Sequence, residues 1–445
     1  MKPNILFILI DSCRSDRLFG ETKNAKTPVI DNLISNGTYF SQTFSSSDYT
    51  GPCVQSIFNS RLPFGCGTTK DYYEKIYSKS TSHLTLLQEN NYNLYAILEE
   101  SVCYWGMKEP FENDDVEFAS RENLHNGLES KILKKFDSVQ MKEPWFFYLH
   151  LMDLHKPCRV PDSSKHLKES DRYDYNLNAI DSCIGKILKK IDLQNTLIVI
   201  SADHGDYVSP MDDGVKPNNP FKTSTKSLIK KFMPKSMTKK IHESKVESNL
   251  KKEMSKFETG HEKRAFKTRP MADKTLFDDV IHVPLIFSGY NLKSTKTVEQ
   301  LVRSIDIFPT IFDIVGVLYD AKKFHGRSIY PLFESEPVDE KPVYIESCTI
   351  KTATKQPRAV VGIRTSDFKY FRSIKDSKSN VHLYDLKNDS LEDNNIAIKN
   401  PDKVNEMELL LQDIQKSAKD EPPVPELSKE EEEDLENELR KMGYL

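Results

Sequence analysis

Three strongly apolar runs in this chain each end in side chains that can bind a metal ion. The runs occupy residues 4–10, 145–151 and 196–200. Asp11 follows the first run, Asp153 and His155 follow the second, and Asp203 with His204 follows the third. Such runs are typical of the covered centre of a parallel sheet, whose carboxyl ends form the edge where ligands bind. The sequence therefore predicts a site where these strand ends meet.

The order of the elements predicts the fold class. Helical patterns separate the apolar runs over about 310 residues, which is typical of an α/β fold with a doubly wound, mostly parallel sheet flanked by helices. Short strand-like pieces follow, with a helical pattern near 401–416, and predict a smaller C-terminal antiparallel sheet plus a helix. We expect a catalytic α/β domain over 1–320, a smaller α+β subdomain over 321–419 and an acidic tail over 420–445.

The bulk composition excludes several classes of protein. A net charge of −4 over 445 residues indicates no nucleic acid partner. No apolar run reaches the roughly 18 residues that a membrane span requires, and residues 5–10 are too few for the core of a signal peptide. The seven cysteines are odd in number and scattered, which argues against a disulfide framework. These features predict a cytoplasmic protein and leave its oligomeric state open.

A basic insertion, about residues 210–269, stands out in this mildly acidic chain because residues 216–269 are rich in lysine and arginine. One interpretation is a solvated loop. The other is a lid or docking surface that concentrates an anionic substrate. The amphipathic stretch 228–233 is also compatible with peripheral contact with an acidic membrane surface.

A divalent cation fits the predicted strand ends. Asp11, Asp203 and His204 supply two carboxylates and an imidazole, which leaves Ca, Mg, Mn and Zn open. Thr50 and Cys53 are candidate nucleophiles on the same cation, because they lie at the start of a predicted helix, where an anion is stabilised. A thiol beside a cation ionises readily, so the chemistry alone does not choose between them. The alternative for Thr50 is a helix N-cap.

Segments spread along the chain resemble the sulfatase family of the alkaline-phosphatase superfamily in strict order. They are 3–16, 27–40, 150–157, 201–206, 274–286, 306–310, 326–328, 369–370, 383–386 and 443–445. The resemblance covers nearly the whole chain apart from the basic insertion. It implies a metal-dependent enzyme that acts on an ester.

The resemblance also fixes the expected position of the nucleophile. With Pro52 as the anchor, Thr50 stands where a sulfatase carries the Cys or Ser that is converted to formylglycine. Threonine cannot form that aldehyde, Val54 replaces the arginine of the signature, and Asn59-Ser60 replaces its Thr-Gly. These departures point to relatives that use an unmodified threonine on phosphate-type esters.

We therefore expect hydrolysis or transfer of a phosphodiester, phosphonate or phospho-headgroup through Thr50. The substrate would be a small-molecule or a glycan- or lipid-linked anionic ester. One alternative is a sulfuric ester hydrolase, a true sulfatase, with a different nucleophile. The other is a non-catalytic binder of an anionic glycan or lipid.

The remaining site residues have expected roles of their own. His155 or His261 would protonate the leaving group, and Lys274, matched by the resemblance, would bind a phosphoryl oxygen. Arg14 and Asp153 are expected on the substrate side. Asp153, His155 and His261 could instead hold a second metal.

His150 is expected to be structural. It lies five residues before His155, and the alternation of a strand would point it to the opposite face.

Overall fold

The structure is a computed structural model. It describes residues 2–63, 82–119, 122–137, 141–208, 255, 259–266, 276–290, 292, 295–347, 360–418, 428–430, 433–434 and 436–437. Most of the basic insertion and of the acidic tail therefore lies outside the described residues. Within the described part of the chain, no helix combines the length and the apolar character needed to cross a membrane.

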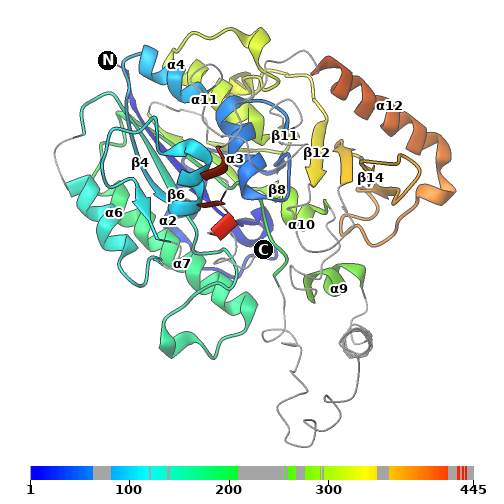
Figure 1. The fold of residues 1–445 in the computed structure, drawn as a ribbon, viewed down its shortest axis with the longest axis horizontal. Coiled ribbons are helices and arrows are strands. Elements are labelled where there is room, and N and C mark those ends of the chain that lie inside the picture. The colour runs from blue at the N-terminus through cyan, green and yellow to red at the C-terminus, as the bar shows by residue number, and fades with distance from the viewer. Residues whose placement is uncertain are drawn as a thin grey trace, which may run out of the picture.

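An eight-stranded sheet forms the centre of the molecule, in the order β10-β2-β9-β7-β1-β6-β4-β5 (Figure 1). Its strands are β1 (Asn4–Ile10), β2 (Thr38–Phe40), β4 (Asn93–Glu99), β5 (Glu117–Phe118), β6 (Trp145–Leu151), β7 (Thr196–Ser201), β9 (Leu285–Gly289) and β10 (Lys296–Val298). Strand β1 pairs in parallel with both β6 and β7, so the three predicted apolar strands are direct neighbours. Strand β9 runs antiparallel to β7 and β2. The predicted mostly parallel sheet is confirmed.

Helices cover both faces of this sheet because every side chain of β1 is buried and successive side chains point to opposite faces. Phe7 and Leu9 share one core cluster with residues of α3 (Thr50–Asn59), α4 (His83–Glu89) and α11 (Ile307–Val315). The alternate residues of β1 share a second cluster with α2 (Pro28–Ser35), α6 (Leu128–Asp137) and α7 (Glu169–Leu188). This arrangement is the predicted doubly wound fold.

A smaller antiparallel sheet follows, made of β12 (Val343–Ser347), β13 (Val360–Arg364), β14 (Phe368–Ser373) and β15 (His382–Asp385). Helix α12 (Pro401–Ser417) packs on this sheet through Met407 and Leu411, which are buried against Tyr344 and Ile363. Figure 1 shows this unit to one side of the large sheet. The predicted C-terminal antiparallel sheet and helix are confirmed.

Short elements join these layers. A three-stranded sheet has the order β11 (Val302–Arg303), β3 (Thr43–Phe44), β8 (His282–Val283). The short α-helices are α1 (Ser15–Leu18), α5 (Glu100–Val102), α9 (Gly260–Phe266) and α10 (Asp278–Ile281). Single turns of 3-10 or π helix are η2 (Cys103–Met107), η3 (Asp162–Ser164), η5 (Ser304–Asp306), η6 (Ala321–Lys323), η7 (Tyr330–Glu334) and η8 (Ala397–Lys399).

Candidate metal centre and active site

Asp11 and Asp203 lie side by side because they follow paired strands. In the parallel pairing of β1 with β7, Leu9 is opposite Ser201, so the two aspartates occupy equivalent places two residues further on. Backbone N–H groups hold the Asp203 carboxylate: those of His204 and Ser12 donate to Oδ1 at 2.7 and 3.2 Å. All of these side chains are buried. The predicted strand ends therefore do meet at one site.

Thr50 faces this pair of carboxylates from the first residue of α3. Its Oγ1 donates a hydrogen bond to Asp11 Oδ2 at 2.9 Å and lies 3.3 Å from His204 Nε2. The residue at the N-cap is Tyr49, and no side chain caps the helix. The hydroxyl of Thr50 is therefore directed at the metal-competent side chains and does not serve as a helix cap.

His150 also belongs to the site, and the expectation that it faces away is wrong. Asp11, His150 and Asp203 each offer a ligand atom, and these atoms all lie within 4.8 Å of one another. Strand β6 ends at Leu151, and a turn follows in which His155 N donates to Met152 O at 3.0 Å. Alternation along a strand does not extend through a turn, so the position of His155 gave no information about His150. A polar residue inside a buried strand was the signal that could have identified it.

Several buried polar atoms at this site have no hydrogen-bond partner in the described part of the chain. They are Asp203 Oδ2 and both ring nitrogens of His150. Buried polar atoms are nearly always paired, so this group fits a bound ion. We call Asp11, His150, Asp203 and His204 the candidate metal centre. Its two carboxylates and two imidazoles suit a divalent cation.

Burial and neighbouring charges act differently on the two carboxylates. Burial, together with the adjacent Asp11 carboxylate, raises the pKa of Asp203 to about 7. Burial also acts to raise the pKa of Asp11, but the imidazoles of His155, His204 and His150 outweigh it, and the pKa falls below its ordinary value. A cation at this site would favour the ionised form of both groups.

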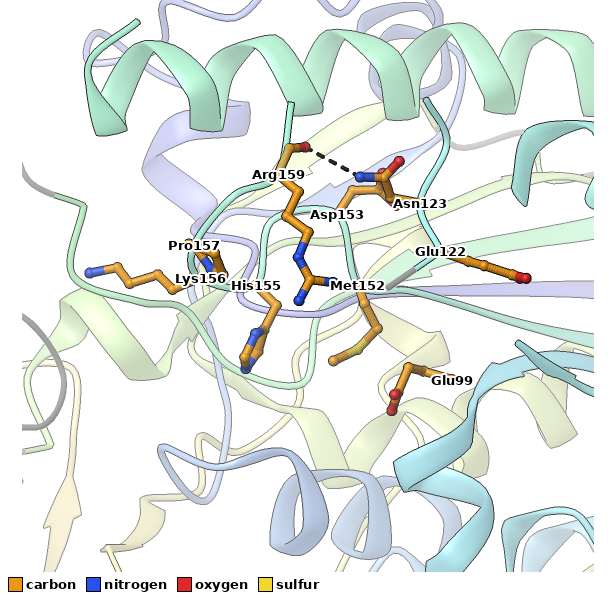
Figure 2. A pocket seen from close by; sticks show the side chains of 9 residues that line it. All are labelled: Glu99, Glu122, Asn123, Met152, Asp153, His155, Lys156, Pro157 and Arg159. Carbon is orange, nitrogen blue, oxygen red and sulfur yellow. Dashed lines mark hydrogen bonds between the residues drawn. The ribbon is translucent and has the colours of Figure 1, made fainter. Parts of the chain in front are cut away.

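His155 and Asp153 line a pocket beside the candidate metal centre (Figure 2). Asp153 Oδ1 accepts a hydrogen bond from Leu124 N at 2.9 Å, and burial raises the pKa of this carboxyl to about 6. His261 lies on α9, where its Nδ1 is 3.5 Å from Asp279 Oδ2. Among the described residues, the only group of three converging ligand atoms is that of Asp11, His150 and Asp203. The structure therefore does not assemble the second metal set suggested by the sequence.

Arg14 is held between two carboxylates. Its guanidinium contacts Asp279 at 2.6 Å and Asp16 at 2.8 Å. Asp279 also joins this group to His261, and its backbone packs against Gly205, where a Cβ would lie 2.4 Å from Asp279 O. The contact of Asp279 with both Arg14 and His261 was not predicted from the sequence.

Two further candidates have different outcomes. Lys274 lies outside the described residues, so its proposed contact with substrate stays a prediction. Cys53 is fully buried, and its thiol donates to Ser47 O at 3.1 Å. Burial raises the pKa of this thiol well above its ordinary value. The structure thus favours Thr50 over Cys53 as the nucleophile.

The fold and the candidate metal centre define an α/β protein with a buried candidate site for a divalent cation at the carboxyl ends of neighbouring strands. The model of the family described as Sulfatase matches residues 3–317, and the model described as "N-sulphoglucosamine sulphohydrolase, C-terminal" matches residues 267–420. The chain belongs to the sulfatase family. Enzymes of this family generally use a divalent metal ion, in agreement with the buried acidic and histidine side chains.

Individual relatives are distant. Arylsulfatase K of Gallus gallus is 26% identical over 175 residues, which are 37% of this chain and 31% of that protein. The chain thus spans about a third of the length of this curated relative. A solved 2-O GAG sulfatase has a TM-score of 0.66 at 17% identity, covering 94% of this chain and 93% of that one. The phosphonate monoester hydrolase of Agrobacterium radiobacter has a TM-score of 0.63 at 13% identity, covering 94% and 96%. These structures share the fold of this chain.

Proposed function

We propose that this protein is a metal-dependent hydrolase or phosphotransferase that acts on a phosphate-type ester through Thr50. The observation that carries the proposal is the position of the Thr50 hydroxyl, 2.9 Å from Asp11 Oδ2 and 3.3 Å from His204 Nε2. It stands at the first residue of the ten-residue helix α3, where backbone N–H groups favour an anion. The candidate metal centre lies around it.

The proposed reaction has two steps. Thr50 Oγ1 forms a bond to phosphorus as the bond from phosphorus to the leaving oxygen breaks, and the proton of Thr50 leaves along its hydrogen bond toward Asp11. The leaving oxygen takes a proton from His155. In the second step, the oxygen of water or of an acceptor hydroxyl forms a bond to phosphorus as the bond from phosphorus to Thr50 Oγ1 breaks. His155 takes the proton of the attacking oxygen, and Thr50 Oγ1 recovers its proton along the hydrogen bond with Asp11. A divalent cation held by Asp11, Asp203, His204 and His150 would lower the pKa of the hydroxyl and neutralise charge on the phosphoryl oxygens.

The general acid is assigned to His155 because of what surrounds the two candidate histidines. His155 lines the pocket beside the candidate metal centre. His261 instead pairs with Asp279, which also pairs with Arg14. We therefore give His261 a supporting role. Lys274 is proposed to bind a phosphoryl oxygen, as the family resemblance implies.

A sulfuric ester is the second candidate substrate, and it is favoured by the family match and by the sulfatases among the relatives. Such an enzyme would use the same centre with another nucleophile, because threonine at position 50 cannot give the formylglycine aldehyde. A non-catalytic binder of anionic glycans or lipids is less well supported. It would have no need for a hydroxyl that is hydrogen-bonded to the buried Asp11 carboxylate and close to the His204 imidazole.

Four 4-nitrophenyl esters test the proposal: a phosphodiester, a phosphonate, a phosphate monoester and a sulfate. Turnover is measured after chelation and again with Ca, Mg, Mn or Zn added singly. We expect metal-dependent turnover of a phosphorus ester that is lost in Thr50→Ala, retained in part in Thr50→Ser and unchanged in Cys53→Ala. Sulfate turnover that survives Thr50→Ala would overturn the assignment of Thr50.

A further inference from the structure

A pocket next to the candidate metal centre carries a charge pattern that bears on the substrate. Its volume is about 450 Å³, part of which is open to solvent. The lining residues are Glu99, Glu122, Asn123, Met152, Asp153, His155, Lys156, Pro157 and Arg159 (Figure 2). We call it the acidic pocket.

The sheet places this pocket along the same carboxyl edge as the candidate metal centre. Glu99 is the last residue of β4, and Asp153 and His155 follow the end of β6. Strands β4, β6 and β1 are successive neighbours, so the pocket continues the same carboxyl edge that carries Asp11. His155, the proposed acid, borders both the pocket and the charge of Asp11. The alcohol part of an ester at Thr50 would extend this way.

Negative charge dominates the lining. Three of the lining side chains are carboxylates: Glu99, Glu122 and Asp153. Lys156 is neutralised by a residue outside the lining, since its Nζ lies 2.9 Å from Glu169 Oε1. Arg159, an exposed residue whose side chain extends between those of His155 and Met152 (Figure 2), is the remaining cation of the lining.

Two of these carboxylates are buried, and one has an unpartnered oxygen. Asp153 is 4% exposed, and its Oδ2 has no hydrogen-bond partner in the described part of the chain. Glu99 is 1% exposed, and Ser101 N donates to its Oε2 at 2.8 Å, which fixes the carboxylate in place. A buried, unpartnered carboxylate oxygen beside a cavity calls for a donor or a cation from the ligand.

The spacing of the carboxylates argues against a metal ion as that cation. Glu99, Glu122, Asp153 and His155 do not form a group of converging ligand atoms, whereas those of Asp11, His150 and Asp203 lie within 4.8 Å of one another in the same described residues. A bare cation needs such convergence. An organic ammonium group is larger and is satisfied by carboxylates distributed around a cavity.

We infer that the acidic pocket receives the alcohol part of the ester and selects an alcohol that carries an ammonium group over one that carries a carboxylate. This inference rests on the proposed function, which places the phosphoryl group at Thr50. The substrate would then be zwitterionic, with its anionic ester at the candidate metal centre and its ammonium group near Glu99 and Asp153.

Binding of three non-hydrolysable phosphonates tests the inference without relying on turnover. The probes are 2-aminoethylphosphonate, propylphosphonate and 3-phosphonopropionate, titrated calorimetrically with each divalent cation present in turn. We expect the aminoethyl probe to bind on the order of tenfold more tightly than the propyl probe, as for one partly exposed ion pair, and the carboxylate probe to bind most weakly. Equal affinities, a reversed order or no binding would overturn the inference.

Matched variants locate the selectivity. Glu99→Gln and Asp153→Asn keep the size and the acceptor oxygen, and each should reduce the preference for the aminoethyl over the propyl probe by roughly threefold or more. Glu334→Gln is the control, because it removes an exposed carboxylate on η7. The neighbouring Phe333 packs against Phe40 of β2, which lies toward the opposite edge of the sheet from β4. This variant should leave the preference unchanged. An unchanged preference in both pocket variants would also overturn the inference.

The two proposals fail separately. Turnover of 4-nitrophenyl esters that depends on Thr50, together with equal affinities for the three probes, would retain the nucleophile and reject the pocket. The expected order of affinities, together with turnover that survives Thr50→Ala, would retain the pocket and reject the nucleophile.

Discussion

Two buried polar clusters of this molecule differ in how their charges are paired. In the candidate metal centre, Asp203 Oδ2 and the ring of His150 have no hydrogen-bond partner among the described residues. The second cluster, which we call the ion cluster, consists of Asp278, Arg364, Lys369 and Glu392. There the fully buried Lys369 ammonium forms ion pairs with Asp278 and with Glu392, the latter at 2.6 Å.

This difference indicates that the candidate metal centre is a binding site and that the ion cluster stabilises the fold. Arg364 adds a further ion pair to Asp278 at 3.2 Å, so every charge of the ion cluster has an opposite charge within the chain, and the cluster ties α10 to the C-terminal sheet. The candidate metal centre is satisfied only when something else binds, because unpaired buried polar groups are costly. Disruption of the candidate metal centre should therefore abolish function, and disruption of the ion cluster should reduce stability.

The largest effect is expected for Asp203→Asn. Loss of this carboxylate should lower metal-dependent turnover by about 10³- to 10⁴-fold, because the charge on the phosphoryl oxygens is then poorly neutralised. The free energy of unfolding of the metal-free protein should not fall, since a neutral amide replaces a buried carboxylate with an unpartnered oxygen. Steady-state kinetics and urea unfolding after chelation measure the two quantities. Turnover within tenfold of wild type would show that the candidate metal centre is not required for function.

Lys369→Met should show the opposite pattern. The change leaves Asp278 and Glu392 without their common cation and should lower the free energy of unfolding by about 3–5 kcal/mol. Turnover per folded molecule should remain near that of wild type. Urea unfolding measures the loss, and Lys378→Met, at an exposed position of the same C-terminal unit, is the matched control with no expected loss. A loss as small as that of the control would show that the ion cluster does not stabilise the contact of α10 with the C-terminal sheet.

The pH dependence of stability sharpens the comparison further. Burial raises the pKa of Glu392 from its ordinary 4.5 to about 7, so the folded state holds this proton more tightly than the unfolded state. Stability should therefore fall as the pH rises from about 4.5 to 7, by roughly 2–3 kcal/mol for this group. Glu392→Gln keeps an acceptor for Asp278 N and should flatten this part of the profile. Parallel profiles for the variant and wild type would contradict the prediction.

The smallest effect is expected for His150→Gln. If His150 binds the metal, its loss should weaken the affinity for the cation by about tenfold, with the remaining ligands still in place. Calorimetric titration of Mn²⁺ or Zn²⁺ measures the change. His166→Gln, at an exposed position, is the control. Equal affinities for both variants would return His150 to the structural role that alternation suggested.

The sequence predicted the features that depend on local pattern. The apolar runs at 4–10, 145–151 and 196–200 form adjacent strands, because continuous apolar runs of this length are typical of the buried centre of a parallel sheet. Adjacent parallel strands then bring Asp11 and Asp203 together without further information. The C-terminal sheet and α12 were also predictable from local pattern, through the short strand-like pieces and the helical pattern near 401–416.

Features that depend on distant contacts could not be predicted. Whether His150 and His155 lie on the same side depends on where β6 ends and the following turn begins. The burial of Cys53 depends on its contact with Ser47, and the ion pair of Arg14 with Asp279 joins positions 265 residues apart. Periodicity contains no information about such pairs. The roles of Thr50, His155 and His261 in catalysis remain predictions.

A covalent intermediate on Thr50 tests the central claim most directly. The protein is mixed with a slowly hydrolysed phosphorus ester and the preferred divalent cation, quenched in acid during turnover and digested for peptide mass spectrometry. We predict a phosphoryl group on Thr50 that is present only with the metal and absent from Asp203→Asn. Continued turnover with unmodified Thr50, or with the phosphoryl group on another residue, would contradict the account.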